Sequence, residues 1–405
     1  MSSNEWKSYK LGELATFFNG RAYKNEEFLS YGTPIVRIQN LTGEGKTVYS
    51  NLELENNKYI NNGDLIFAWS ATFGPYIWKG PKSIFHYHIW KIECNKDLLD
   101  KEFFYYKLHQ ITKALKGSGN GTLFVHITKG QMENTEILIP DLRHQRRIAE
   151  ILTSLDEKIE LNSSINQTLE EIARSIYNEW FSNYNYPNAD GKRKHSELGE
   201  IPIEWDVDSI GKICYVQNGY AFKSNDFQEK GDIGIIKIKN INGNIVDIEN
   251  TDFVDVNVVE KLDKKFKIES GSLLIAMTGA EVGKIGLVPL NHKNLWLNQR
   301  VGMFKEKANY SNLFLYLLLS TENYQTTIQN SALGSAQPNI SASAIESIRA
   351  IIPTDEVIEQ FGKIVKPIFT KILDNLAENE TLKSTRDNLL PKLILGEVET
   401  LISNA

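Results

Sequence analysis

The six residues Asn19-Gly20-Arg21-Ala22-Tyr23-Lys24 return 199 positions later as Asn218-Gly219-Tyr220-Ala221-Phe222-Lys223. Other blocks recur in the same order, and their offset grows to 213 toward the end of the chain. A growing offset is expected when loops of different length have been inserted into two copies of one unit. The 405 residues therefore contain one unit of about 200 residues that is used twice.

The other recurring blocks lie on both sides of this stretch. They pair Glu5-Trp6 with Glu204-Trp205, Leu11-Gly12 with Ile210-Gly211, Arg37-Ile38-Gln39-Asn40 with Lys237-Ile238-Lys239-Asn240, Gly63-Asp64-Leu65-Ile66 with Gly271-Ser272-Leu273-Leu274, and Gly121-Thr122, Ile127-Thr128 and Pro140 with Gly334-Ser335, Ile340-Ser341 and Pro353. An ordered series of this kind is typical of a tandem duplication.

Each copy ends in a long helical pattern with a heptad seam. The first seam contains Ile148, Leu152, Leu155, Ile159, Asn162, Asn166, Leu169, Ala173, Ile176 and Trp180. The second contains Phe361, Val365, Ile368, Ile372, Asn375, Asn379, Leu382, Arg386, Leu389 and Leu393. Steps of four and three sustained over more than four heptads predict a coiled coil. Pro367 is predicted to kink or start the second helix and Pro391 to end it near Leu390.

Two asparagines lie in the middle of each seam, Asn162 with Asn166 and Asn375 with Asn379. A buried amide at such a position costs stability but specifies register and partner. Alternatively the seam drifts, so that these side chains face solvent and Ile165 turns inward.

The chain divides into segments of different character. Short β-rich runs mix with helical stretches such as 101–115, so we expect a mixed, α+β fold in each copy. Residues 182–196 are rich in Asn, Tyr and Lys, which is typical of a linker. The predicted segments are a first module (1–142), a helical spacer (143–185), a second module (186–353) and a C-terminal helical spacer (354–405).

The net charge of −6 is mildly acidic and excludes a protein that coats nucleic acid by bulk positive charge. The two modules carry +1 and −2, whereas the helical segments carry −2 and −3. The modules are therefore close to neutral, and a local basic groove remains possible.

Several protein classes are disfavoured by missing motifs. Cys94 and Cys214 cannot form a disulfide framework, so a reducing cytoplasm is expected. The longest strongly apolar run, 313–319, is too short to span a bilayer. We find no phosphate loop, no adenine-methyltransferase motif and no cofactor loop. Pro140-Asp141 with Asp156-Glu157-Lys158 imitates a nuclease signature, but the latter residues are expected to be solvated helix charges.

The run Phe85-His86-Tyr87-His88-Ile89 supplies candidate DNA contacts. On a strand His86 and His88 would point to one face, and at an offset of 212 they correspond to Asn298 and Arg300. All four residue types can hydrogen-bond to base edges. Equivalent positions that carry different side chains in the two copies are expected of two modules that recognise different sequences. A metal site, which would need further ligands, and plain polar residues on an exposed strand face are the alternatives.

Arg37 with Gln39, and Lys237 with Lys239, alternate with isoleucines and are candidate phosphate or base contacts. The adjoining asparagines of both copies, Asn40 and Asn240, are expected to fix a turn. The shared Gly-Thr/Ser and Ile-Thr/Ser residues at 121–128 and 334–341 either place hydroxyls near phosphates or, as we favour, cap a helix.

Taken together, these features resemble the specificity (S) subunits of type I restriction–modification systems. The resemblance covers nearly the whole chain and includes Ile139-Pro140 followed by Gln145-Arg146-Arg147-Ile148. It also includes Leu169-Glu170-Glu171-Ile172-Ala173 with Ile176-Tyr177 and Trp180-Phe181, and Ser196-Glu197-Leu198-Gly199-Glu200-Ile201-Pro202. Glu359-Gln360-Phe361 departs from the Gln-Arg-Arg pattern, which makes the partner contacts of the second helix less certain.

The resemblance implies a non-catalytic, cytoplasmic DNA-binding subunit. Each module would be a target recognition domain for one half of an asymmetric bipartite sequence, and the helices would form an antiparallel coiled-coil spacer with pseudo-twofold symmetry. Partners would be double-stranded DNA, two methyltransferase (M) subunits with S-adenosylmethionine, and two restriction (R) translocase/nuclease subunits with ATP and Mg. No cofactor and no metal site is expected on this chain.

Two other functions fit the sequence. The chain could be a coiled-coil interaction scaffold that presents two modules to carbohydrate or protein. It could also be the specificity subunit of a related restriction system with a different nuclease, or one that only modulates methylation.

Overall fold

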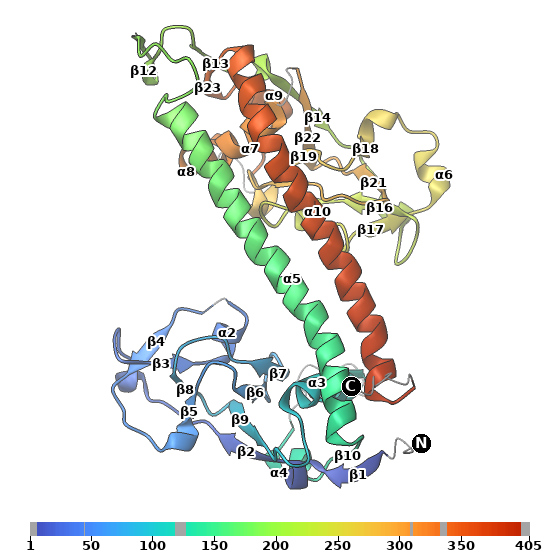
Figure 1. The fold of residues 1–405 in the computed structure, drawn as a ribbon. Helices are drawn as coiled ribbons and strands as arrows, with labels where there is room; N and C mark the ends of the chain where they lie inside the picture. The colour runs from blue at the N-terminus through green and yellow to red at the C-terminus, as the bar shows by residue number, and fades with distance from the viewer. Residues whose placement is uncertain (1–5, 44, 118–126, 308–310, 333–337, 398–405) are drawn as a thin grey trace, which may run out of the picture. The chain divides into compact units, whose positions relative to one another are not determined.

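The computed structural model describes residues 6–43, 45–117, 127–307, 311–332 and 338–397 (Figure 1). Glu5 and the pairs Gly121-Thr122 and Gly334-Ser335 lie outside these residues. The chain forms two compact units. Unit 1 contains residues 1–158 and 382–405, and unit 2 contains residues 159–381. The boundary between the two units falls within both long helices of the chain. The segment limits predicted from the sequence fall instead at the ends of these helices, and they stay a prediction.

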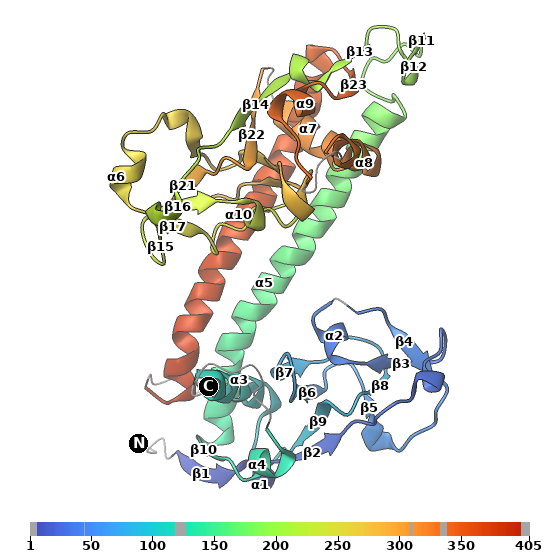
Figure 2. The same ribbon diagram turned by 180° about the vertical axis from the view of Figure 1, so that it is seen from behind.

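The first module forms three sheets in unit 1 (Figure 2). Strands β1 (Lys7–Lys10) and β10 (Glu136–Ile139) make an antiparallel pair. An antiparallel sheet has the order β2 (Ala15–Asn19), β9 (Ile89–Cys94), β6 (Leu65–Ala68), β7 (Gly74–Ile77). A mixed sheet has the order β4 (Val48–Ser50), β3 (Thr33–Val36), β8 (Ser83–Phe85), β5 (Tyr59–Ile60), with β3 and β8 parallel. The helices are α1 (Leu11–Leu14), α2 (Ile38–Leu41), α3 (Lys101–Gly117) and α4 (Lys129–Glu133), with 3-10 turns η1 (Asn25–Glu27) and η2 (Asn56–Lys58).

The second module repeats this topology in unit 2. The pair is β13 (Asp206–Ser209) with β23 (Arg349–Ile352), and the antiparallel sheet is β14 (Cys214–Asn218), β22 (Val301–Glu306), β19 (Leu273–Ala276), β20 (Ile285–Leu287). The mixed sheet is β15 (Phe227–Gln228), β17 (Asp252–Val254), β16 (Ile233–Ile236), β21 (Asn294–Leu297), β18 (Lys267–Ile268), with β16 and β21 parallel. The helices are α6 (Val256–Val259), α7 (Ser311–Leu319), α8 (Glu322–Ser331) and α9 (Ala342–Glu346). The 3-10 turns are η4 (Ile210–Lys212), η5 (Ser224–Asp226), η6 (Ile238–Asn240), η7 (Lys264–Phe266) and η8 (Gly279–Glu281).

Both modules have the same parallel pair and, apart from the additional edge strand β15 in the second, the same strand order. The predicted duplication and the α+β fold are therefore confirmed. The predicted linker is only partly irregular. A hairpin of β11 (Arg193–Ser196) and β12 (Gly199–Pro202) begins within it, because Gly199 takes a positive φ of 103° in the tight connection.

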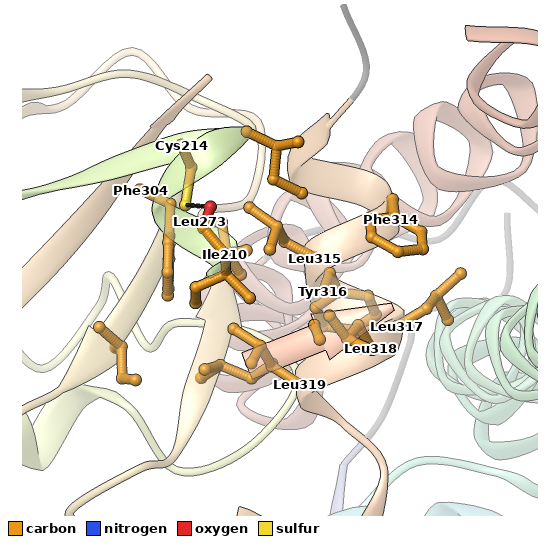
Figure 3. Packing of buried hydrophobic residues seen from close by; sticks show 14 of the residues in the cluster. Ile210, Cys214, Leu273, Phe304, Phe314, Leu315, Tyr316, Leu317, Leu318 and Leu319 are labelled. Atoms are coloured by element: carbon orange, nitrogen blue, oxygen red, sulfur yellow. Dashed lines mark hydrogen bonds between the residues drawn. The ribbon is translucent and has the colours of Figure 1, made fainter. Parts of the chain in front are cut away.

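Helix α7 forms much of the core of unit 2, as Figure 3 shows. Its residues from Phe314 to Leu319 are buried on all sides, which explains why this stretch is the most apolar of the chain. The thiol of Cys214 donates to the carbonyl oxygen of Ile210 in the same core at 3.3 Å (Figure 3). Burial raises the pKa of Cys214 to about 12. None of the described helices combines the length and apolar character that a membrane crossing requires.

The long helices α5 (Leu142–Tyr177) and α10 (Asp355–Ile394) run antiparallel where they meet in each unit. The side chain of Asp141 caps α5 by accepting from the amide of His144 at 3.0 Å. The helix ends in a π-helical turn, Asn178–Ser182, that buries Trp180 and Phe181.

Pro367 does not start α10, because the helix begins 12 residues earlier, and Pro391 does not end it near Leu390, because the helix continues to Ile394. A kink at Pro367 stays a prediction. The amide of Leu395 still donates to the carbonyl of Pro391 at 3.0 Å. Leu393 and Ile394 lie in the core of unit 1, and this burial stabilises a last turn that proline alone would disfavour.

Candidate nucleic-acid interface

A three-residue turn follows a parallel strand in each module. In the first module His86-Tyr87-His88, here named the His86 turn, connects β8 with β9. In the second module Asn298-Gln299-Arg300, the Asn298 turn, connects β21 with β22. The expectation that His86 and His88 lie on a strand is therefore wrong, because the chain reverses between two strands at this point.

Five backbone hydrogen bonds of 2.8–3.1 Å recur at equivalent positions around the two turns. In the first module they join His86 N to Val36 O, Tyr87 N to Arg21 O, Ile89 N to His86 O, Arg21 N to Phe85 O, and Trp69 N to His88 O. In the second they join Asn298 N to Ile236 O, Gln299 N to Tyr220 O, Val301 N to Asn298 O, Tyr220 N to Leu297 O, and Met277 N to Arg300 O. The two runs that align at an offset of 212 in the sequence therefore have the same pattern of backbone hydrogen bonds.

The Asn-Gly pair that opens the recurring stretch has a structural cause at these turns. A Cβ atom on Gly20 would lie 2.2 Å from the carbonyl oxygen of His86. A Cβ atom on Gly219 would lie 2.2 Å from that of Asn298. Only glycine allows this close approach of two backbone segments, so the motif supports the turn in both modules.

Aromatic rings surround the His86 turn. Trp69, at the end of β6, donates from its indole nitrogen to the carbonyl oxygen of Tyr87 at 2.8 Å. The ring of Tyr87 lies 3.9 Å from that of His88 and 4.4 Å from that of His86, between centroids. The ring of Tyr23 stacks on that of His86 with 6.4 Å between centroids. Tyr87 is 40% exposed, so this cluster ends in an aromatic side chain at the surface.

The histidine pair is a poor cation or metal site. Burial, the nearby His88 and the charge of Arg37 lower the pKa of His86 to about 4, so its ring is neutral at pH 7. Within the described residues, no group of three or more His, Cys, Asp and Glu side chains is placed to hold a metal ion. A third ligand for the metal alternative is therefore missing from the described part of the chain.

The Asn298 turn is polar. Asn298 is only 8% exposed, and its side-chain oxygen accepts from the amide of Arg300 at 3.2 Å, so it holds the turn together. Gln299 and Arg300 are exposed. The structure places Met277, which is buried, at the position that Trp69 occupies in the first module.

The second set of candidates lies where a strand ends and a short helical turn begins. Arg37 follows β3 and precedes α2, where its guanidinium donates to the carbonyl oxygen of Lys46 at 2.8 Å. Gln39 lies within α2, and its amide can accept from the guanidinium of Arg37. The chain leaves the strand at this point because Asn40 closes a turn. Its side chain accepts from the amide of Arg37 at 2.9 Å and donates to the carbonyl oxygen of Gly45 at 3.1 Å.

The equivalent lysines of the second module share one carboxylate. Lys237 and Lys239 both lie 2.6 Å from Asp252. Asn240 again closes the turn, by accepting from the amide of Lys237 at 2.9 Å and donating to Asp247 O at 3.0 Å. The turn-fixing role of both asparagines is confirmed, whereas DNA contact by Arg37, Gln39, Lys237 and Lys239 stays a prediction.

The hydroxyl pattern late in each module caps helices. Thr128 accepts from the amide of Gln131 at 3.2 Å at the start of α4, and Ser341 accepts from the amide of Ala344 at 3.1 Å at the start of α9. The capping interpretation is confirmed for these two residues.

Four seam asparagines are buried between α5 and α10 in unit 2. Asn162 and Asn375 have no exposed area, and Asn166 and Asn379 are 8% and 5% exposed. Asn162 donates to the side chain of Asn379 at 2.9 Å, and Asn375 donates to that of Asn166 at 2.8 Å. The drifting seam with solvent-facing amides is therefore excluded.

Three residues in or beside the two turns are not among the candidates predicted from the sequence: Tyr87, Gln299 and Trp69. Tyr87 and Gln299 lie between the candidates of each run, and their equivalence at the same offset of 212 was a usable signal. Trp69 lies 17 residues before His86, and only the pairing of β6 with β9 brings it to the turn.

The chain thus belongs to a class of protein built from two copies of one α+β module, each associated with a long helix. A family model described as the type I restriction modification DNA specificity domain matches residues 3–171 and 202–387. The chain belongs to this family.

Curated relatives span nearly the same length. The specificity subunit of the type I restriction enzyme MjaVIII of Methanocaldococcus jannaschii is 24% identical, over 97% of this chain and 93% of that protein. The HindI specificity subunit of Haemophilus influenzae is 26% identical, over 98% of this chain and all of that protein. The crystal structure of a type I S subunit from M. genitalium has the same fold, with a TM-score of 0.62 at 16% identity over 99% of this chain and 98% of that one.

Proposed function

We propose that this chain is the DNA sequence-recognition subunit of a type I restriction–modification complex, in which each module reads one half of an asymmetric bipartite target. The observation that carries the proposal is the pair of equivalent turns. Their backbones are the same in both modules, whereas their exposed side chains differ. Two sites of one geometry and different chemistry suit the recognition of two different short sequences.

The chemistry of the complex would come from partner subunits. The relatives are named specificity subunits of restriction enzymes, which supports a chain that directs catalysis without performing it. We propose M subunits, two in number, that carry S-adenosylmethionine, and two R subunits that use ATP and Mg. The complex would act on double-stranded DNA in the cytoplasm.

The long helices would set the unread gap between the half-sites. Residues 145–181 of the first helical segment would form a rod of about 55 Å at about 1.5 Å per residue. Modules associated with such a helix would contact DNA at separate patches. Inserting one heptad into each helix should change the gap and leave both half-sites unchanged, and a methylome with an unchanged gap would contradict the spacer role.

The direct test is to co-express the chain with its cognate methyltransferase subunit and to map methylated adenines across a genome. We expect one bipartite motif with a fixed gap. Exchanging residues 1–142 for the equivalent module of another such subunit should change one half-site only. If no sequence-specific methylation appears, and binding of duplex DNA by the complex hardly depends on salt, the chain is a scaffold for another kind of partner.

A further inference from the structure

The two turns differ in the kind of interaction that they offer to a base pair. The His86 turn presents Tyr87 against the rings of Trp69 and His88, and His86 at its start is uncharged at pH 7. The Asn298 turn presents an amide and a guanidinium, Gln299 and Arg300. One turn therefore offers mainly aromatic surface, and the other offers an amide and a guanidinium as hydrogen-bonding groups.

Hydrogen bonds hold the backbones of both turns. The indole of Trp69 donates to the carbonyl of Tyr87, and the backbone amide of Trp69 donates to the carbonyl of His88 at 3.1 Å. In the second module the side chain of Asn298 accepts from the amide of Arg300. A preorganised contact surface loses little conformational entropy on binding, which favours sequence readout.

The side chains at the tips are available for a ligand. Within the described residues, neither the amide of Gln299 nor the guanidinium of Arg300 has a hydrogen-bond or ion-pair partner. Other cations of the modules are engaged: Arg21 makes a two-pronged contact with Glu27 at 2.7 and 3.0 Å, and Lys237 and Lys239 share Asp252. The guanidinium of Arg300 is therefore more available for a hydrogen bond to a base than the side chains of Arg21, Lys237 and Lys239.

We propose that Tyr87 and Arg300 are specificity-determining residues that act by different physics. The His86 turn reads its half-site through apolar contact with a thymine methyl group, and the Asn298 turn reads its half-site through a two-pronged hydrogen bond from Arg300 to guanine, beside Gln299. This inference rests on the proposed function. It predicts a thymine in the first half-site and a guanine in the second that depend on these two side chains.

The first experiment uses the complex of the full chain with its methyltransferase subunit and reads the methylome. Tyr87→Ala should relax one position of the first half-site with about a fourfold loss of discrimination. Arg300→Ala should relax one position of the second with about a 10- to 100-fold loss. Tyr31→Ala and Lys230→Ala are matched controls, because both side chains are exposed on the same modules and lie outside the turns. Both controls should keep the motif.

Arg300→Lys separates base contact from phosphate contact. Lysine retains the charge but lacks the planar fork of the guanidinium, so we expect a weaker preference for guanine in this variant with non-specific binding retained. If Arg300→Ala weakens binding equally for all sequences and leaves the motif unchanged, Arg300 contacts only phosphate and the inference is wrong.

Base analogues test the two modes in the wild-type complex. Replacing the thymine of the first half-site by deoxyuridine removes one methyl group and should weaken binding about fourfold. Replacing the guanine of the second half-site by 7-deazaguanine removes one acceptor and should weaken binding about tenfold. A bipartite motif that survives Tyr87→Ala and Arg300→Ala unchanged would overturn this inference and leave the proposed function standing, whereas the lack of any bipartite motif would overturn both.

Discussion

Asn375 donates from Nδ2 to Oδ1 of Asn166 over 2.8 Å, between the two long helices and with no exposed area on Asn375. Asn166 in turn donates to the backbone carbonyl of Ile372 at 3.2 Å. The same pattern joins Asn162 with Asn379. Apolar side chains at these four positions would pack in more than one register, whereas these amide bonds form in one register only.

Removing one amide should therefore destabilise the chain more than removing both. Asn375→Leu leaves Oδ1 of Asn166 buried without its donor and should lower the free energy of unfolding by about 1–3 kcal/mol. The double variant Asn166→Leu/Asn375→Leu should recover most of this loss in urea denaturation. It should also methylate DNA at more than one gap length, because the register is less specified. A double variant as unstable as the single one, with one fixed gap, would contradict this role.

Arg386 marks a difference between the two copies. Its guanidinium lies 2.6 Å from Asp156, whose other oxygen accepts from the hydroxyl of Tyr106 at 2.7 Å. Ala173 in the first seam corresponds to Arg386, and Phe369 in the second copy corresponds to Asp156. Both residues are apolar and buried.

Arg386→Ala should lower the free energy of unfolding by about 1–2 kcal/mol, because it leaves a partly buried carboxylate without its cation. Arg147→Ala is the control, since Arg147 makes an exposed pair with Glu150 and should change stability by less than about 0.5 kcal/mol. Equal effects of both variants in urea denaturation would show that the burial of the Asp156 pair is irrelevant.

The mixed fold, the duplication and the equivalence of the two candidate runs could be predicted from the sequence, because a duplication leaves a constant local offset between its copies. That these runs form turns could not be predicted. Their side-chain environment could not be predicted either. Trp69 reaches the His86 turn through strand pairing over 17 residues, and the ion pair of Arg386 with Asp156 joins segments 230 residues apart. The prediction that Pro391 ends the second helix was wrong, because the burial of Leu393 and Ile394 outweighs the local tendency of proline to end a helix. Long-range packing decided each of these cases.

The neutral state of His86 makes the stability of the first module depend on pH. Because the pKa falls from 6.5 in the unfolded chain to about 4 in the folded protein, the unfolded chain binds more protons between these values. Stability is fully present above pH 6.5 and is lost as the pH falls toward 4. The loss should not exceed about 2 kcal/mol for this half-buried ring.

His86→Asn, which introduces the residue of the equivalent turn, should remove this part of the pH dependence. Urea denaturation between pH 4 and 7 measures it. His195→Asn is the control, because the side chain of His195 is exposed, and the loss of stability toward pH 4 should persist in this variant. If the wild type and His86→Asn have the same slope, His86 is not desolvated.

Lys107 is a buried cation on α3. It is 6% exposed, its ammonium donates to the carbonyl of Ile394 at 3.2 Å, and it lies 5.9 Å from the ring centre of Trp6. Within the described residues it forms no ion pair. Desolvation lowers its pKa from 10.5 to about 8, so the folded state carries a penalty for the charge at neutral pH.

Lys107→Leu should raise the free energy of unfolding by about 1–2 kcal/mol at pH 7, since the desolvated charge costs more than the bond to Ile394 contributes. The unfolded chain binds more protons than the folded one between pH 8 and 10.5, so the stability of the wild type rises over this range and the advantage of the variant shrinks. Lys113→Leu, on the exposed face of α3, should show neither effect. Urea denaturation at pH 7 and pH 10 measures both, and a destabilised Lys107→Leu would show that capping the end of α10 outweighs the desolvation of the ammonium.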